Sequence, residues 1–172
     1  MRRFIVNFLL IIFSFVLQTT VFRYIDFGGI TPNLLLILTV SLGLMRGDKS
    51  GTLVGFFCGL LVDVFFGTYI GFYALIYMYI GFIIGKFHKI FFPQNIFLPM
   101  LFIVVSDFVF GFTCYILFFL FRTKFDIDYY MLHVIVPEMV YTTIVSIFFY
   151  PVILRLSTWL EDIEQRSAKK FV

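Results

Sequence analysis

Three acidic residues lie inside long apolar stretches of this sequence of 172 residues: Asp63, Asp107 and Glu138. A charged side chain at membrane depth costs roughly 2.5–3.5 kcal/mol on insertion scales, so such residues face the interior of a helix bundle and often mark function. Asp107 and Glu138 lie near the middle of two consecutive stretches, whereas Asp63 lies close to the end of its own. Their chemistry is either a proton relay or cation site, or a hydrogen-bonded link between helices.

The surrounding residue types bear on that choice. No lysine or arginine lies at middle depth to pair with either Asp107 or Glu138, and no set of residues completes a relay or a coordination sphere. Either desolvation leaves neutral carboxylic acids that donate hydrogen bonds, or the acids accept bonds from neighbours. Candidate partners are Ser106, Thr113, Tyr141, Gln18 and His133. We interpret the acids as polar links between helices and keep the relay or cation site as the functional alternative.

Pro137 stands directly before Glu138. Proline lacks a backbone N–H, and its ring clashes with the carbonyl of the residue four positions earlier, so the last apolar stretch is predicted to kink. Membrane proteins tolerate such kinks where neighbouring groups satisfy the freed backbone. A protonated Glu138 is one such neighbour.

Glycines recur at a spacing of four residues. Gly51, Gly55 and Gly59 form a doubled GxxxG pattern, and the pairs Gly67 with Gly71 and Gly81 with Gly85 follow. Small residues at this spacing let helix backbones approach closely. The pattern predicts tight packing, either within this protein or against another membrane protein.

The composition indicates a membrane protein. Apolar residues make up 62% of the chain and charged residues 13%, against roughly 25% charged in a soluble domain. A short chain cannot bury so much apolar surface in one water-soluble core. We predict an all-α integral membrane protein with about six transmembrane helices, at residues 4–22, 30–45, 50–66, 69–85, 97–121 and 130–154. The second stretch is short, and the alternative is five spans with that stretch re-entrant.

The basic residues predict the topology. With the N-terminus inside, the inner segments contain Arg2, Arg3, Arg46, Lys49, Lys86, Lys89, Arg155, Arg166, Lys169 and Lys170, and the outer ones Arg23, Arg122 and Lys124. The positive-inside rule then places both termini in the cytoplasm. Residues 155–172 form a cytoplasmic tail, either an amphipathic helix anchored at the interface by Trp159 or a solvated end.

No residue pattern indicates catalysis or a cofactor. Cys58 and Cys114 lie in apolar stretches and are interpreted as small buried hydrophobes. His88 and His133 lack metal-ligand spacing, and no nucleophile, HExxH or phosphate-loop motif occurs. We therefore expect a protein without enzymatic activity, metal, cofactor or nucleic-acid partner, which acts within the bilayer or through its helix surfaces.

Several motifs occur together in a recognisable order. The residues that form these motifs are Pro32-Asn33-Leu34-Leu35-Leu36, Arg46-Gly47, Gly55-Phe56, Gly59-Leu60-Leu61-Val62-Asp63, Gly67, Gly71 and Tyr73-Ala74-Leu75, and later Pro137-Glu138, Tyr141 and Tyr150-Pro151. In order and spacing they resemble the MreD family of rod shape-determining membrane proteins, over nearly the whole chain.

The resemblance implies a non-enzymatic role in the machinery that elongates the lateral peptidoglycan wall of a bacterium, at its cytoplasmic membrane. It implies MreC as the principal partner, beside MreB, RodA and a class B penicillin-binding protein. The six-helix design also looks like the binding subunits of energy-coupling-factor transporters. The alternative function is therefore vitamin binding in such a transporter, which requires a polar pocket near the outer face.

Overall fold

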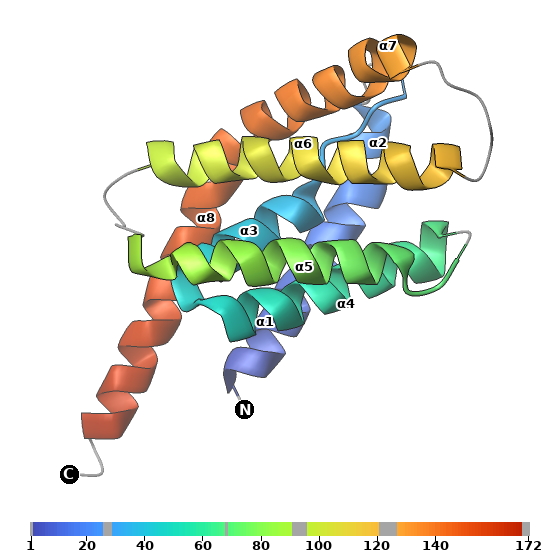
Figure 1. Ribbon diagram of the computed structural model, residues 1–172. Coiled ribbons are helices and arrows are strands. Elements are labelled where there is room, and N and C mark those ends of the chain that lie inside the picture. The colour runs from blue at the N-terminus through green and yellow to red at the C-terminus, as the bar shows by residue number, and fades with distance from the viewer. Residues whose placement is uncertain (1, 26–28, 68, 91–95, 121–126, 170–172) are drawn as a thin grey trace.

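The computed structural model describes residues 2–25, 29–67, 69–90, 96–120 and 127–169, which are mainly helical (Figure 1). The first half contains α1 (Arg2–Thr19), α2 (Val21–Tyr24), α3 (Leu34–Arg46), α4 (Asp48–Phe66) and α5 (Phe72–Lys86). The second half contains the 3-10 turn η1 (Phe87–Ile90), α6 (Phe97–Leu120), α7 (Ile127–Tyr130), the π-helical turn η2 (Met131–Ile135) and α8 (Val136–Lys169). The prediction of an all-α membrane protein is confirmed.

Four helical stretches of the described chain are long and apolar enough to cross a membrane. They are Phe4–Tyr24, Asp48–Phe66, Phe97–Leu117 and Met131–Leu160. The other two principal helices are shorter, with 13 residues in α3 and 15 in α5. At about 1.5 Å per residue α3 is about 20 Å long, less than the roughly 30 Å of a hydrocarbon core.

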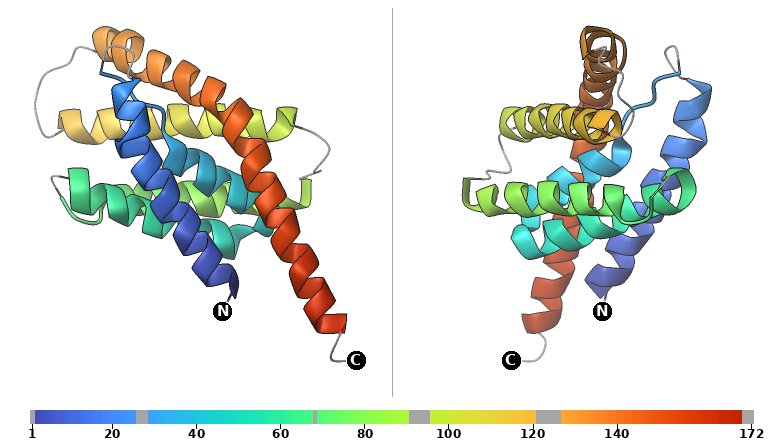
Figure 2. Two further views of the ribbon diagram at one scale, coloured as in Figure 1. Left: turned by 180° about the vertical axis from the view of Figure 1, so that it is seen from behind. Right: turned by 45° about the vertical axis from the view of Figure 1, so that its right-hand side comes forward.

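The short helix α3 occupies the centre of the bundle. Every residue from Leu34 to Met45 is buried, and α3 contacts α1, α4, α5, α6 and α8. Figure 2 shows α1 and α8 on one side of it and α4 and α5 on the other. A helix that is apolar on all sides has no face for water and is stable only when surrounded. Protein therefore surrounds α3 along its length, so the length of α3 need not match the thickness of the bilayer.

Helices α4 and α5 form an antiparallel pair whose backbones touch. A Cβ atom at Gly55 would collide with the backbone carbonyl of Tyr77, and one at Gly59 would lie 2.5 Å from the Cα atom of Ala74. A Cβ at Gly51 would collide with the carbonyl of Gly81. The three glycines spaced by four residues thus line the contact between α4 and α5, where larger residues do not fit.

Helix α3 joins the same contact. We call Gly43, Gly51, Gly81 and Gly85 the glycine junction, because they bring three helices together at one crossing. A Cβ at Gly43 would lie 3.3 Å from the Gly81 oxygen, 3.6 Å from the Gly51 Cα and 3.6 Å from the Gly85 nitrogen. Gly43 was not predicted to take part, since it stands alone on its helix.

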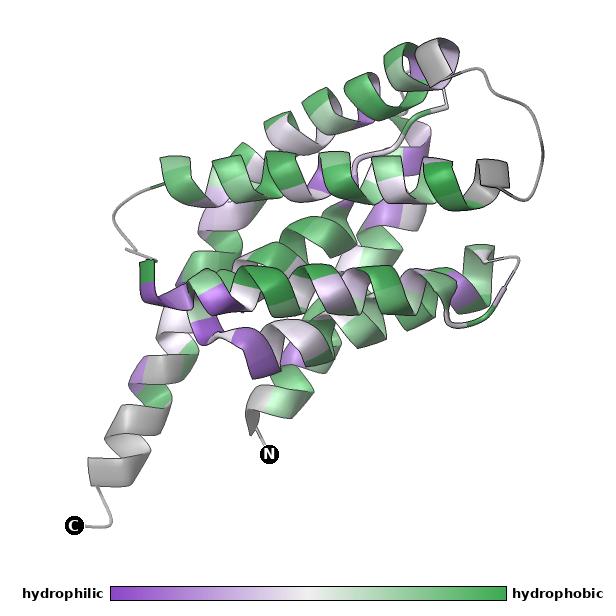
Figure 3. Ribbon diagram, viewed as in Figure 1, coloured by the Kyte–Doolittle hydropathy of each residue, from purple (hydrophilic) through white to green (hydrophobic). Residues whose placement is uncertain are grey.

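Polar contacts hold the bundle at the end where α3 passes into α4. The Arg46 guanidinium donates to Asn7 Oδ1 of α1 over 2.6 Å and to Ser157 Oγ of α8 over 3.2 Å. Gly47 follows with a φ of +88°, a conformation that favours glycine and separates the two helices. Figure 3 shows hydrophilic residues concentrated where α4 begins and α5 ends. The two chain termini point toward this same end of the bundle (Figure 1).

Helix α8 continues well beyond the predicted sixth span. It extends without a break to Lys169 and contains Pro151, and its ribbon changes direction along its length (Figure 2). A proline inside a helix removes one backbone hydrogen bond and is a common cause of such bends. Of the predicted tail, residues 155–169 continue this helix, whereas residues 170–172 lie outside the described chain.

Candidate functional site

A cavity of about 580 Å³ opens between the helices near the start of α3. Residues from α1, α2, α4, α5, α6 and α7–α8 line it together with the extended segment before α3. Its lining includes Arg23, which is exposed, and Asn33 and Tyr77, which are buried. We call this space the outer cavity, because α2, α7 and the start of α3, which border it, lie at the end of the bundle opposite both termini (Figure 1).

Asn33 organises one wall of the outer cavity. Its Oδ1 atom accepts hydrogen bonds from the Leu36 backbone N–H, at 3.1 Å, and from the Tyr77 hydroxyl, at 2.7 Å. Its own backbone N–H donates to Thr142 Oγ1 of α8 over 3.2 Å. Asn33 is therefore an N-cap that also ties α3 to α5 and α8.

Gln18 completes the capping of α3. Its Oε1 atom accepts a hydrogen bond from the Leu35 backbone N–H over 3.2 Å. The first turn of a helix leaves N–H groups without intrahelical partners, and burying them unpaired is costly. Two amide side chains, from α1 and from the cap position, satisfy two of them here.

The extended segment before α3 also borders the cavity. Pro32 disfavours a helical conformation in the residue before it, and α3 begins only after Asn33. Gly29, Thr31 and Asn33 all line the cavity. Non-helical backbone at membrane depth is tolerated where it is buried in protein or borders a water-filled space. The span predicted at 30–45 thus consists of an extended segment, which ends at Asn33, and the short helix α3.

The two acids predicted near middle depth lie close together on α6 and α8. Asp107 is only 4% exposed, and the Thr142 side chain lies beside it. Both of its carboxylate oxygens are buried without a hydrogen-bond partner of normal geometry among the described residues. Glu138 borders the outer cavity and lies near enough to Asp107 to interact electrostatically.

Three of the suggested partners of these acids make contacts with other groups. Tyr141 donates to the Ile25 carbonyl over 2.9 Å. The His133 ring stacks on Tyr129 at 4.3 Å between centroids. Gln18, as described above, caps α3. The contacts that the structure describes for these three side chains thus lead to groups other than Asp107 and Glu138.

The helix preceding Pro137 is locally rewound. Residues Met131–Ile135 adopt a π-helical turn, and the Val136 N–H donates to the Met131 carbonyl. This turn lies just before the proline whose ring disturbs the helix on its N-terminal side. π-helical turns within α-helices are frequent at functional sites, and here Val134 and Ile135 of the turn line the outer cavity.

Asp63 has a different role from the other two acids. Its carboxylate accepts hydrogen bonds from the backbone N–H groups of Gly71, Tyr73 and Ala74, at 3.0, 2.9 and 2.9 Å. It therefore caps α5 from the end of α4. Gly67 and Gly71 belong to the turn between these helices, and Gly71 has a φ of +100°. The residues of this acid–glycine group were noticed in the sequence, but their capping geometry was not predicted.

A second hollow lies between α1 and α4. It measures about 590 Å³ and is lined mainly by apolar side chains of the two helices, with Arg46 and Lys49 at one end. We call it the α1–α4 groove. Only 11% of the apolar stretch that begins at Phe4 is buried within the protein. Phe4, Phe8 and Leu9 are each more than half exposed. The groove is thus bordered by apolar side chains that the rest of the described chain leaves uncovered.

The remaining candidate residues are placed as follows. Cys58 and Cys114 are free and buried, and Cys114 borders the outer cavity. His88 Nδ1 donates to the Leu44 carbonyl over 2.6 Å. Tyr150 is fully buried on α8. Among the residues described, no cluster of three or more His, Cys, Asp or Glu side chains is arranged to hold a metal ion.

The capping roles of Asn33 and Gln18 were not predicted, although the sequence contains a signal for the first. An asparagine directly before an apolar helix is a standard N-cap pattern, and it would have moved the predicted start of the helix from residue 30 to residue 34. For Gln18 the sequence holds no comparable signal. Its role depends on α1 lying beside the start of α3.

The Asn33 cap yields a test of this wall of the cavity. Asn33→Ala is expected to lower the free energy of unfolding by about 2–3 kcal/mol, because a buried N–H and a buried hydroxyl lose their acceptor. Tyr77→Phe should cost about 1 kcal/mol. The measurement is reversible unfolding in mixed micelles. In the double variant the two effects should not add, since both changes remove the same hydrogen bond; full additivity contradicts the assignment.

Comparison with known proteins gives one match. The family model described as rod shape-determining protein MreD matches residues 1–159. No curated protein and no solved structure matches the chain.

Proposed function

This chain belongs to the MreD family of rod shape-determining proteins, and from that membership we propose that it is a non-enzymatic component of the bacterial cell-elongation complex that binds MreC. The observation that carries the proposal is the family match, which covers nearly the whole chain. The protein is a multi-pass protein of the bacterial cytoplasmic membrane. Its proposed task is to help organise the synthesis of lateral peptidoglycan, with MreB, RodA and a class B penicillin-binding protein as further partners, direct or through MreC.

The proposed topology has six crossings and both termini in the cytoplasm. The two termini point toward one end of the bundle (Figure 1), as an even number of crossings requires. Arg46 ends α3, Lys49 lies in the first turn of α4, and Lys86 and Lys89 lie at the end of α5 and in η1. These positions are at that same end of the bundle, which agrees with the positive-inside rule. Helices α3 and α5 are the two short crossings. α3 is surrounded by protein, and η1 extends α5 by a further turn.

We place the activity in contacts between proteins and not in catalysis. The described chain consists of helices joined by short connections, and its buried Asp107 lies beside Thr142. Asp63 is engaged in capping α5. These features support a scaffold that presents helix surfaces within the bilayer.

The α1–α4 groove is our proposed contact for the membrane helix of MreC. Its walls are apolar over most of their length, as a transmembrane helix requires, and Leu53, Val54 and Phe57 of α4 face Phe4, Phe8 and Ile11 of α1 across it. Helix α1 packs mainly against α3 and α4, which leaves much of its surface available. Packing of a helix between α1 and α4 would bury apolar side chains on both.

The experiment is co-purification of MreC after extraction in a mild detergent. Leu53→Trp, which narrows the groove, should reduce the recovery of MreC by about ten-fold, because loss of a central packing contact costs about 1.4 kcal/mol or more. Leu101→Trp is the matched control. It changes a side chain of similar exposure on α6, outside the groove, and should leave recovery unchanged.

Two results would contradict the proposal in separable ways. Equal losses for Leu53→Trp and Leu101→Trp would remove the groove as the contact while keeping MreC as partner. Absence of MreC from the wild-type preparation, with a tightly bound vitamin or a pair of ABC ATPases in its place, would replace the proposed function by the energy-coupling-factor alternative.

A further inference from the structure

Glu138 is the one feature of the outer cavity that the scaffold role does not explain. It borders the cavity, and it forms neither a hydrogen bond nor an ion pair with the residues that the structure describes. Asp107 lies next to it, with both carboxylate oxygens buried and without normal hydrogen bonds to described residues. Two neighbouring acids without a countercharge are costly at this depth.

We propose that the outer cavity binds an alkylammonium group, which enters from the outer face and takes Glu138 as its countercharge. The ligand class follows from the lining. Aromatic rings of Tyr73, Tyr77, Phe110 and Tyr130 border the same space as the carboxylate. Aromatic rings attract organic cations through their negative faces, and several rings beside one acid form a usual site for ammonium groups.

The rings are held in place by one another and by the protein. Phe110 lies 5.1 Å from Tyr77 and 6.1 Å from Tyr73 between ring centroids. The Tyr77 hydroxyl donates to Asn33 Oδ1, so its phenol proton is used and the ring remains for contact. A preorganised lining of this kind loses little entropy when it binds a ligand.

An anion is a poorer fit to the same space. The start of a helix is often an anion site because its N–H groups are free. At α3 the Leu35 and Leu36 N–H groups are already taken by Gln18 and Asn33. Arg23 also lines the cavity, but on α2, where its side chain is exposed. Among the described lining residues Arg23 is thus the only cation, and it is exposed, whereas Glu138 and the aromatic rings are at least partly buried.

A metal ion is likewise a poorer fit. Calcium takes about six to eight oxygen ligands, and magnesium about six in strict octahedral geometry. The described residues contain no group of three or more His, Cys, Asp or Glu side chains suited to a metal. The side-chain oxygens of Asn33 and Gln18, which line the same cavity, already accept hydrogen bonds.

The size of the cavity suits a small ligand or a headgroup. Its volume of about 580 Å³ falls within the roughly 300–1,000 Å³ of small-molecule sites. The same ammonium chemistry is available from a free amine, such as ethanolamine or choline, and from a lipid with that headgroup. Both sources can reach a cavity that opens at the outer end of the bundle.

The test uses the full chain in nanodiscs of phosphatidylglycerol, which lacks an amine. Choline and ethanolamine are titrated by calorimetry, and 3,3-dimethylbutanol, the uncharged analogue of choline, is the ligand-side control. In a second arm the protein is purified with phosphatidylethanolamine and phosphatidylglycerol together, and the lipid it retains is identified by native mass spectrometry. Inorganic phosphate serves as the anionic probe.

Two variants connect binding to the cavity. Glu138→Gln should weaken amine binding by at least about ten-fold, since loss of one partner of a desolvated charge pair costs more than the corresponding 1.4 kcal/mol or so. Asp162→Asn, the same change at an exposed acid of α8, should have no effect. Val134→Phe should block binding by filling the cavity, and thermal unfolding of each variant reports whether it is folded.

Each outcome decides the proposal. Binding of the free amines but not of the neutral analogue supports it with a soluble ligand, and selective retention of phosphatidylethanolamine supports it with a lipid headgroup. Equal binding of choline and its neutral analogue, tighter binding of phosphate, or no retention of any amine overturns it. The ligand-side comparison needs only the wild-type protein, so it is decisive even if both cavity variants fail to fold.

Discussion

Gly55→Ala is expected to destabilise the folded protein by about 3 kcal/mol, although it adds only one methyl group. The added Cβ would collide with the Tyr77 carbonyl oxygen and would lie 2.8 Å from the Tyr77 carbonyl carbon and 3.1 Å from the Met78 nitrogen. All three are backbone atoms, which cannot rotate away as a side chain does. The helices α4 and α5 must therefore separate, and the contacts along both lose packing. The measurement is the unfolding free energy in mixed micelles.

Gly111→Ala is the matched control for this prediction. There the nearest atoms to a new Cβ are side-chain carbons of Ile135, at 3.2–3.7 Å, and these can shift by a few tenths of an ångström. The control should cost less than about 1 kcal/mol. A result in which both alanines cost the same would show that the α4–α5 backbones have more room than the structure gives them.

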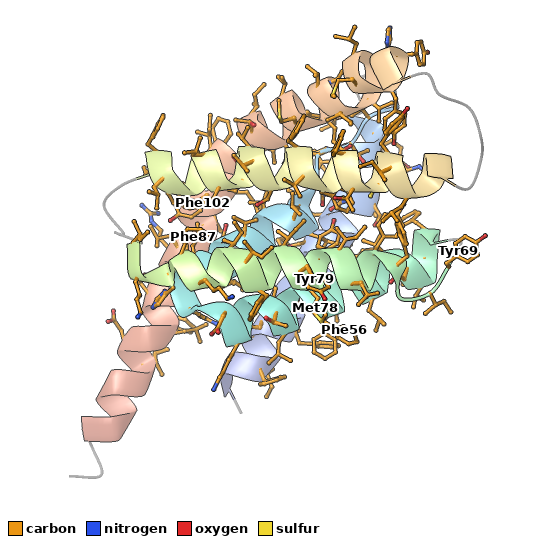
Figure 4. All side chains as sticks on the ribbon, viewed as in Figure 1. Phe56, Tyr69, Met78, Tyr79, Phe87 and Phe102 are labelled. Atoms are coloured by element: carbon orange, nitrogen blue, oxygen red, sulfur yellow. The ribbon has the colours of Figure 1, made fainter. Side chains whose placement is uncertain are left out.

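The same contact fixes what the other faces of α4 and α5 present to the membrane. Phe56 follows Gly55 and points away from the bundle, and Met78 and Tyr79 of α5 lie near it on the same side (Figure 4). Phe56 and Tyr79 are exposed. Tyr69 projects outward at the turn between the two helices (Figure 4). Small residues on one face and large ones on the other are the arrangement expected of a helix pair with one face in lipid.

The apolar stretches predicted most of the helices because their length alone is informative. The stretch expected at 97–121 corresponds to α6, and the stretch at 50–66 corresponds to α4 with an earlier start. Apolarity does not say whether lipid or protein surrounds a helix, however. The stretch from Leu34 to Met45 is as apolar as a lipid-facing span, yet its surroundings are five other helices. The sequence shows that this stretch is short, but it does not show that the stretch is short because protein surrounds it.

The outer cavity could not be predicted from the sequence. The transporter alternative requires a polar pocket near the outer face, and the predicted outer connections offer few polar residues for one. The polar residues that form it come instead from helix interiors, with Gln18 on α1, Tyr77 on α5 and Glu138 on α8. Only the packing of these helices brings them together. The proximity of Asp107 and Glu138 was accessible, because depth along two antiparallel helices follows from counting residues.

A single carboxylate joins α4 to α5 at the end opposite the glycine junction. At the C-terminal end of α5, the rings of Phe87 of η1 and Phe102 of α6 lie 5.2 Å apart between centroids and connect α5 to α6 (Figure 4). At the α5 start the connection is polar, since Asp63 accepts three backbone N–H groups there. The orientation of α5, and with it the Tyr73 and Tyr77 walls of the outer cavity, depends on that acceptor.

Asp63→Ala is therefore expected to cost about 4 kcal/mol of unfolding free energy. Three N–H groups lose their acceptor, and each buried donor left unpaired costs roughly 1–3 kcal/mol. Asp63→Asn keeps one acceptor oxygen and should cost about half as much. Asp48→Ala is the control, because Asp48 lies at the other end of α4 and its carboxylate bonds only the exposed Lys49 N–H among the described groups. It should cost less than about 1 kcal/mol.

Amide hydrogen exchange separates a capping role from a general loss of stability. If Asp63 caps α5, exchange in Asp63→Asn should accelerate first at the Tyr73 and Ala74 amides, while the amides in the middle of α4 remain protected, because local opening needs less free energy than global unfolding. Uniform acceleration through α4 and α5 would mean that the carboxylate supports the whole helix pair. In that case the walls of the outer cavity would be positioned by the glycine contact alone, and Asp63 would contribute only to the global stability of the bundle.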